Sequence, residues 1–335
     1  LLKDVKINFF NQNIFENINF NFNLRENNYL FQEIKLEVNK VNFTSDIIRA
    51  KKNNNNFILE GMLENKKFIL NKNLSKLLNL DFPGIDLKDT SFKSKNKFFL
   101  EINNKFDIKN FELDTDLILD QFNYAQPDLF NKYLLNSNDI IIFRDHNIKL
   151  KYINNQISIE GIGKVKLGNN FDDIKYLISK KENNFNIISN VNLENLNLKK
   201  NKNLQNIFPK INDEIILSDQ KINIEYKNKN LLVSGKGKIK LDKVFEDIDY
   251  IISQKNEITN FNLNLSLTKT KFKLTPLNYK KKKNSKFFFK NCTYKIYNDI
   301  SRYKNIKKKN NKKLGIKDFF SSKINKFNLN KKIFI

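Results

Sequence analysis

The sequence predicts a mainly β protein, an elongated antiparallel sheet made of repeated units, with a few short amphipathic helices. The first observation is an internal repeat, because residues 138–181 align without gaps on residues 212–255 with 20 identities in 44 positions. The second is an alternation of apolar and polar residues, which is the period of a strand with one apolar face. The third is composition, because 40% of the 335 residues are hydrophobic, which is enough for a core.

The repeat also sets the predicted domain organisation. We predict a β-rich repeat region over residues 1–279, with units at about 138–211 and 212–279 and a weaker unit before residue 138. Residues 280–335 differ, because they hold 19 Lys and Arg against two Asp and contribute +17 of the net charge of +25. This segment is predicted to be a basic, disordered tail.

Strands are predicted wherever apolar residues alternate with polar ones. Asn-rich clusters at 53–56 and 228–230 fit the turns between them, because Asn tolerates the left-handed backbone of tight hairpins. Strands joined by such turns form an antiparallel meander. The clearest strand segments are residues 18–24, 34–38, 57–63, 221–226 and 261–268.

One segment in each unit departs from this alternation. Apolar residues over 245–252 follow the spacing of one helix face, so a short amphipathic helix is predicted there and over the equivalent residues 171–178. A third short helix is predicted over residues 74–80, before Pro83.

Paired acids begin the first two of these segments. Asp172 and Asp173 in one unit match Glu246 and Asp247 in the next. In the first turn of a helix such carboxylates complement the helix dipole, so they are interpreted as structural residues and not as acid/base catalysts.

A Gly-x-Gly-Lys motif is repeated at residues 161–164 and 235–238. A dinucleotide-binding loop would need a third glycine and a position between a strand and a helix. Here the strand pattern continues through residues 165–167, so the glycines are predicted to mark a bulge or a close backbone approach.

The single cysteine and the single histidine limit the possible chemistry. Cys292 excludes an internal disulfide framework or a multi-thiolate zinc site, and it is interpreted as an incidental residue of the tail. His146 has Gln220 as its repeat partner and no nucleophile motif beside it, so it is predicted to be a solvated loop residue. We therefore predict a protein that is not an enzyme and that uses no cofactor or metal.

Membrane and export signals are not found in the sequence. No apolar run approaches the roughly 20 residues of a membrane-spanning helix, and residues 1–10 lack a signal-peptide pattern. A chain that begins at Leu1 is expected to be a fragment that has lost an upstream anchor or export signal.

Strands of the form apolar-x-apolar-x-Gly-x-apolar recur over about residues 5–275, most clearly at 43–50, 57–66 and 233–237. This pattern resembles the AsmA-like proteins of Gram-negative envelopes, and more narrowly their YhdP and TamB relatives, the repeat-containing bridge-like lipid transfer proteins. The resemblance implies a curved, taco-like sheet whose apolar groove conducts phospholipid acyl chains between inner and outer membranes. It also implies a periplasmic location, an inner-membrane anchor absent from this chain, and partners that include phospholipid, both membranes and other envelope proteins.

An apolar strip on one face of a sheet must be covered or used. If the strip binds lipid, alternating residues of two predicted strands would line it. These candidate groove residues are Ile222, Ile224, Tyr226, Leu263, Leu265 and Leu267.

Two other functions are considered. In a closed β-rich structural or adhesion repeat, the same residues would form a dry core and no ligand would bind. In a nucleic-acid-binding protein, the Lys clusters at 280–283 and 307–313 would contact phosphates. The sequence favours this last function least, so nucleic acid is not an expected partner.

Overall fold

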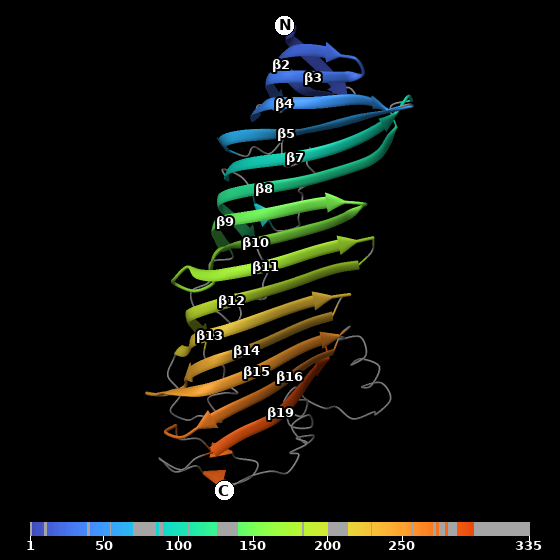
Figure 1. Ribbon diagram of the computed structural model, residues 1–335. Helices are drawn as coiled ribbons and strands as arrows, with labels where there is room; N and C mark the ends of the chain where they lie inside the picture. The colour runs from blue at the N-terminus through green and yellow to red at the C-terminus, as the bar shows by residue number, and fades with distance from the viewer. Residues whose placement is uncertain are drawn as a thin grey trace, which may run out of the picture. The chain divides into compact units, whose positions relative to one another are not determined.

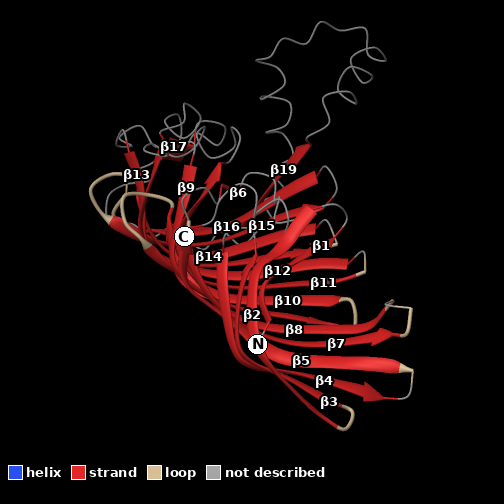
Figure 2. Ribbon diagram, turned by 90° about the horizontal axis from the view of Figure 1, so that it is seen from above, coloured by secondary structure: helices blue, strands red, loops and turns tan. Residues whose placement is uncertain are grey.

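A computed structural model of the chain describes residues 2–9, 12–38, 41–53, 55–69, 85–86, 90–105, 107–125, 140–182, 184–199, 214–228, 230–255, 258–270, 273–274, 279–280 and 287–297. These residues fold almost entirely as antiparallel β-strands, and none of them belongs to a helix (Figure 1, Figure 2). The prediction of a mainly β, antiparallel fold is confirmed.

The chain divides into two compact units, and the first extends over the described residues up to 125, 140–166 and 173–185. Most of its strands pair with the next strand in sequence, so they form an open antiparallel meander. The short β6 pairs with the end of β8. The strands are β1 (Leu2–Phe9), β2 (Gln12–Arg25), β3 (Asn28–Val38), β4 (Val41–Asn53), β5 (Asn56–Ile69), β6 (Ile85–Asp86), β7 (Ser91–Asn103), β8 (Ile108–Ala125), β9 (Ile140–Ile153), β10 (Gln156–Lys166) and β11 (Asp172–Lys181).

The second unit extends over the described residues 167–172 and 186–297, so most of β12 belongs to it. Its main strands again pair in sequence order, and β19 pairs with β16. A separate two-stranded sheet joins β17 to β18. The strands are β12 (Asn184–Lys199), β13 (Glu214–Lys227), β14 (Asn230–Lys240), β15 (Phe245–Lys255), β16 (Ile258–Leu267), β17 (Lys273–Leu274), β18 (Tyr279–Lys280) and β19 (Phe287–Tyr297).

The sequence repeat corresponds to a group of four strands. Gly161 of β10 lies opposite Ile148 of β9, and 74 residues later Gly235 of β14 lies opposite Ile222 of β13. The strands β8 to β11 therefore match β12 to β15 in order. The pairings of β8 with β9 and of β9 with β10 also match those of β12 with β13 and of β13 with β14 in register. The predicted β-sheet repeat is confirmed in this respect.

The helices predicted over residues 171–178 and 245–252 are wrong, because these residues form strands β11 and β15. In β15 the buried Ile248 and the half-buried Ile252 lie on one face, whereas Ile251 is 46% exposed on the other. The helical spacing combined residues from both faces of a strand. Pairing along both edges of β15, together with its β-branched residues, favours the extended backbone.

Two further predictions fall largely outside the described residues. The helix predicted over residues 74–80 lies wholly outside them. Of the predicted tail at 280–335, the structure describes residue 280 and Phe287–Tyr297, which form the end of β18 and all of β19. The boundary between repeat region and tail remains a prediction.

Bulges divide several strands into two halves. Asp145 in β9 and Asp219 in β13 have positive φ values of 56° and 53°, and the pairing register shifts beside each of them. A bulge bends its strand and increases the local twist, and the long strands are visibly bent in Figure 2. We call the part between the bulge and the tight hairpin turns the tip half, and the other part the core half.

The core halves hold most of the buried apolar residues. In the second unit they form one cluster that includes Leu267, which is completely buried. Burying one such side chain stabilises the fold by about 1.5–3 kcal/mol. The two clusters are Ile215, Leu217, Ile239, Leu241, Ile248, Leu265 and Leu267 in the second unit, and Val41, Phe92 and Leu119 in the first.

Candidate functional site

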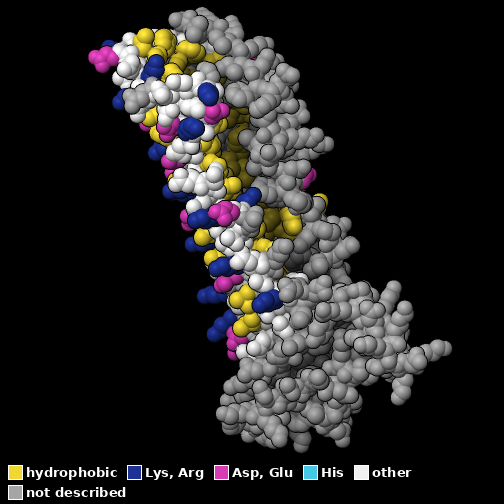
Figure 3. All heavy atoms as spheres, turned by 90° about the vertical axis from the view of Figure 1, so that its right-hand side faces the viewer, with side chains coloured by type: hydrophobic (Ala, Val, Ile, Leu, Met, Phe, Trp, Pro, Cys, Tyr) yellow, Lys and Arg dark blue, Asp and Glu magenta, His cyan; other side chains and the backbone are white. Residues whose placement is uncertain are grey.

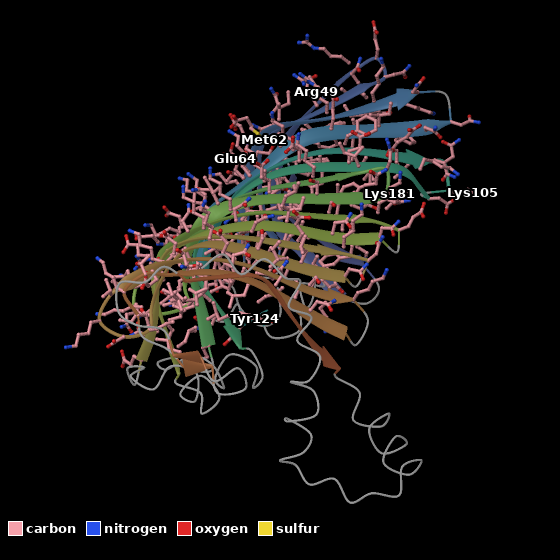
Figure 4. All side chains as sticks on the ribbon, turned by 90° about the horizontal axis from the view of Figure 1, so that it is seen from below. Arg49, Met62, Glu64, Lys105, Tyr124 and Lys181 are labelled. Carbon is pink, nitrogen blue, oxygen red and sulfur yellow. The ribbon has the colours of Figure 1, made fainter. Side chains whose placement is uncertain are left out.

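The two faces of the sheet differ in chemistry. In Figure 4, Arg49, Met62 and Glu64 project from one side of the first unit and Tyr124 lies on the other. In the space-filling view, hydrophobic side chains lie together behind a flank that carries charged side chains (Figure 3). We call the face that carries Tyr124 the apolar face and the opposite one the charged face.

A row of apolar positions crosses the tip half of the first unit, and we call it the tip row. Residues directly opposite each other in an antiparallel sheet lie on the same face, so the pairing register traces this row through eight strands. At about 4.8 Å per strand it is roughly 34 Å long. Its members are Phe22, Phe31, Ile48, Gly61, Phe98, Leu113, Tyr152 and Ile157.

The tip row is only partly covered. Phe22 is 48% exposed, and the other seven positions are half-buried. Neighbouring aromatic rings pack against each other, with centroids 5.4 Å apart for Phe22 and Phe31 and 5.6 Å apart for Phe111 and Tyr152. The row was not predicted from the sequence, although alternation in residues 18–24 and 57–63 marked two of its strands.

The predicted groove residues lie on β13 and β16 of the second unit, on one face. The register joins Ile222 to Leu263 through Gly235 and Tyr250. Ile222, Leu263 and the neighbouring Ile224 and Tyr226 are half-buried.

The remaining two predicted groove residues are covered. Leu265 is 5% exposed and Leu267 is 0% exposed, and both belong to the core cluster. The six candidates therefore divide between the tip half and the core. Whether any of them contacts lipid remains a prediction.

A polar band crosses the apolar face of the first unit beside the tip row. The backbone N–H of Ser94 donates to Oδ1 of Asn65 at 2.8 Å, and the Thr115 hydroxyl donates to Oδ1 of Asn96 at 3.0 Å. Nδ2 of Asn96 donates to the carbonyl of Leu63 at 3.0 Å. These side chains satisfy one another, so the band is stable within the sheet without a ligand.

His146 is not a solvated loop residue, because it is completely buried in β9. The Asp145 bulge brings both Phe143 and His146 onto the apolar face. Nε2 of His146 lies 3.1 Å from the carbonyl of Lys164, which can only accept, so this nitrogen carries the proton.

Burial makes His146 and its neighbour Tyr176 poor acid/base catalysts. Nδ1 of His146 lies 3.1 Å from the hydroxyl of Tyr176, which donates to it. Burial lowers the pKa of His146, although the Lys164 carbonyl and the charge of Asp145 act in the opposite direction. Burial also raises the pKa of Tyr176 to about 12. Both side chains are therefore neutral, and the hydrogen bond between them is internal to the fold.

The paired acids begin strands, so their predicted position in a helical turn is wrong. Glu246 is buried and accepts backbone N–H bonds from Thr268, Lys269 and Thr270 at 2.7–3.0 Å. Burial alone would raise the pKa of Glu246, but these bonds outweigh it and the pKa is lowered. Asp172, its repeat partner, accepts from the backbone of Glu194 at 2.8 Å. The structural interpretation of these carboxylates is supported.

The glycines mark close approaches within strands, as predicted. A Cβ at position 161 would overlap the ring of Tyr176, and a Cβ at position 235 would overlap the ring of Tyr250. The second glycines are equally constrained, since Gly163 lies against His146 and Gly237 against Gln220.

The described residues contain no group of three or more His, Cys, Asp or Glu side chains that could hold a metal ion, and none of them forms an apolar helix of membrane-spanning length. Cys292 lies in β19 with its Cα opposite that of Leu263. Comparisons of the chain with protein-family models, curated proteins and solved structures give no significant match.

Proposed function

We propose that the chain is a non-enzymatic segment of an envelope protein that holds phospholipid acyl chains along its apolar face. In this proposal the face is a curved groove that conducts lipid between the inner and outer membranes, on the periplasmic side. The observation that supports it most directly is the tip row, eight adjoining positions that are apolar and incompletely covered. Large contiguous apolar surfaces on folded proteins usually bind something.

The dimensions of the tip row suit a long, thin ligand. One leaflet of a bilayer contributes about half of a hydrocarbon core of roughly 30 Å, so an extended acyl chain is about 15 Å long. A row of roughly 34 Å, with strands about 4.8 Å apart, accommodates two such chains end to end. Because apolar contacts are not directional, a chain can slide along the row without a specific binding geometry.

The test is lipid extraction and native mass spectrometry of the full chain purified from a bacterial envelope. We expect phospholipid to copurify with the wild type and to be lost in Leu113→Asp/Ile157→Asp, which places two carboxylates on the tip row of β8 and β10. The matched control, Ile118→Asp/Ile162→Asp, changes the charged face of the same two strands at side chains that are 44% and 47% exposed.

Circular dichroism checks that all three proteins are folded. A lipid-free wild type, or a tip-row variant that retains as much phospholipid as the control, would exclude the lipid-groove function. In that case a structural or adhesion repeat is the alternative, favoured by the buried clusters of the core halves. Nucleic-acid binding through the basic segment rests on residues that lie mostly outside those described.

A further inference from the structure

The hairpin tips of the first unit carry an excess of cations. Five hairpin turns follow β2, β4, β7, β9 and β11. Together these turns contain seven cations and three acids, counted over residues 24–29, 51–57, 102–108, 151–157 and 180–185. All ten charged side chains belong to exposed residues. The cations are Arg25, Lys51, Lys52, Lys105, Lys151, Lys180 and Lys181, and the acids are Glu26, Asp107 and Glu182.

These tips adjoin the open part of the apolar face. The ammonium of Lys52 lies 5.9 Å from the ring centroid of Phe57. Lys180 follows Tyr176 and Ile178 at two-residue spacing, so its side chain leaves β11 on the apolar face. Beside the Lys105 turn, Ile108 is 65% exposed. Lys105 and Lys181 lie at the ends of their hairpins in Figure 4.

We propose that the tips bind the phosphate groups of anionic phospholipids whose acyl chains lie on the tip row. This inference rests on the proposed function and adds a class of head group to it. The lysines of the tips match the chemistry of such a lipid. When its acyl chain lies on the tip row, its charged head group lies at the end of the apolar surface, next to these lysines. A nucleic acid would use the cations but would leave the neighbouring exposed apolar residues without a partner, so lipid is the better match.

The test measures which head group the full chain removes from vesicles at physiological salt. The vesicles contain equal amounts of fluorescent phosphatidylglycerol and phosphatidylcholine with identical acyl chains. The tip variant is Lys52→Gln/Lys105→Gln/Lys180→Gln/Lys181→Gln. The control variant is Lys93→Gln/Lys97→Gln/Lys149→Gln/Lys175→Gln, which removes the same charge from exposed residues of the charged face in the same unit.

We expect the wild type and the control variant to take up the anionic lipid severalfold more than the zwitterionic one. The tip variant should take up both equally, with phosphatidylcholine uptake unchanged. Lipid uptake without head-group preference in the wild type would overturn this inference alone, as would an equal loss of preference in both variants. No uptake of either lipid would overturn the proposed function as well. Salt-sensitive binding of duplex DNA, lost in the tip variant while lipid preference persists, would reassign the tips to nucleic acid.

Discussion

Nδ1 of His146 lies 3.1 Å from the hydroxyl oxygen of Tyr176, inside the first unit. The other ring nitrogen of His146 is bonded to the carbonyl of Lys164, at 3.1 Å. In the next repeat, Nε2 of Gln220 donates to the equivalent carbonyl of Lys238, at 2.8 Å. Histidine and glutamine therefore perform the same backbone contact at matched positions, and only histidine titrates near neutral pH.

The substitution His146→Gln is expected to reduce the loss of stability in mild acid. Burial lowers the pKa of His146 below its ordinary value of 6.5, so the unfolded chain binds this proton more readily than the folded chain does. The stability from neutral His146 is complete above about pH 6.5 and decreases as the pH falls through the lower pKa of the folded state. Urea unfolding at pH 8 and pH 5 measures the effect.

The comparison between the two proteins isolates this histidine, because all carboxylates are common to both. We expect the wild type to lose more free energy of unfolding between the two pH values than the variant does. Identical losses would contradict a neutral, buried His146. Tyr176→Phe serves as a control, because it removes the hydroxyl partner and leaves the titrating ring in place.

The substitution Gly235→Ala is expected to destabilise the fold by about 1–3 kcal/mol, because the new methyl group overlaps the ring of Tyr250. Removing that ring in Gly235→Ala/Tyr250→Leu should recover part of the loss, so the two changes are non-additive. Ser234→Ala, one residue away on the opposite face of β14, is the control. Denaturant unfolding measures the stability of the wild type, the two single variants Gly235→Ala and Tyr250→Leu, the double variant and the control. Strictly additive effects of the two substitutions would argue against a contact between positions 235 and 250.

The substitution Glu246→Gln is expected to destabilise the fold by roughly 1.5–3 kcal/mol, because a buried carboxylate that accepts several hydrogen bonds is replaced by an amide. Asp247→Asn, at the exposed neighbouring residue, should change stability by less than about 0.5 kcal/mol. Chemical denaturation at pH 7 compares the two. Equal effects would show that the bonds to residues 268–270 contribute little.

The lowered pKa of Glu246 also predicts how the stability of the fold changes at acid pH. Its pKa in the folded chain lies below the ordinary value of 4.5. Its contribution is therefore present above about pH 4.5 and is lost as the pH falls through the folded pKa. The stability difference between the wild type and Glu246→Gln should shrink as the pH is lowered from 6 to 3, and a constant difference would contradict this assignment.

Much of the local structure could be predicted from the sequence. Alternation identified strands such as residues 57–63, and the Asn cluster at 53–56 lies at the turn between β4 and β5. The strand glycines were also interpretable, because their neighbours continued the strand pattern. These features depend on residues close together in the chain, so the printed order of residues is enough to find them.

The errors arose where distant strands decide the outcome. Residues 245–252 have apolar positions compatible with both a helix and a strand, and pairing with β14 and β16 selects the strand. His146 has no local signal for burial, because its inward position comes from the bulge at Asp145. The bulge becomes visible only when β9 is paired with β10.

Which residues alternate, where the hairpins turn and how the units repeat could be predicted from the sequence, because these are properties of neighbouring residues. Which apolar positions of a strand are buried depends on the tertiary structure. Leu263 and Leu267 follow the same alternation, yet Leu263 is half-buried and Leu267 is completely buried. The physical reason is that burial depends on the side chains that distant strands bring to the same place, and alternation specifies a face of the sheet but not what covers it.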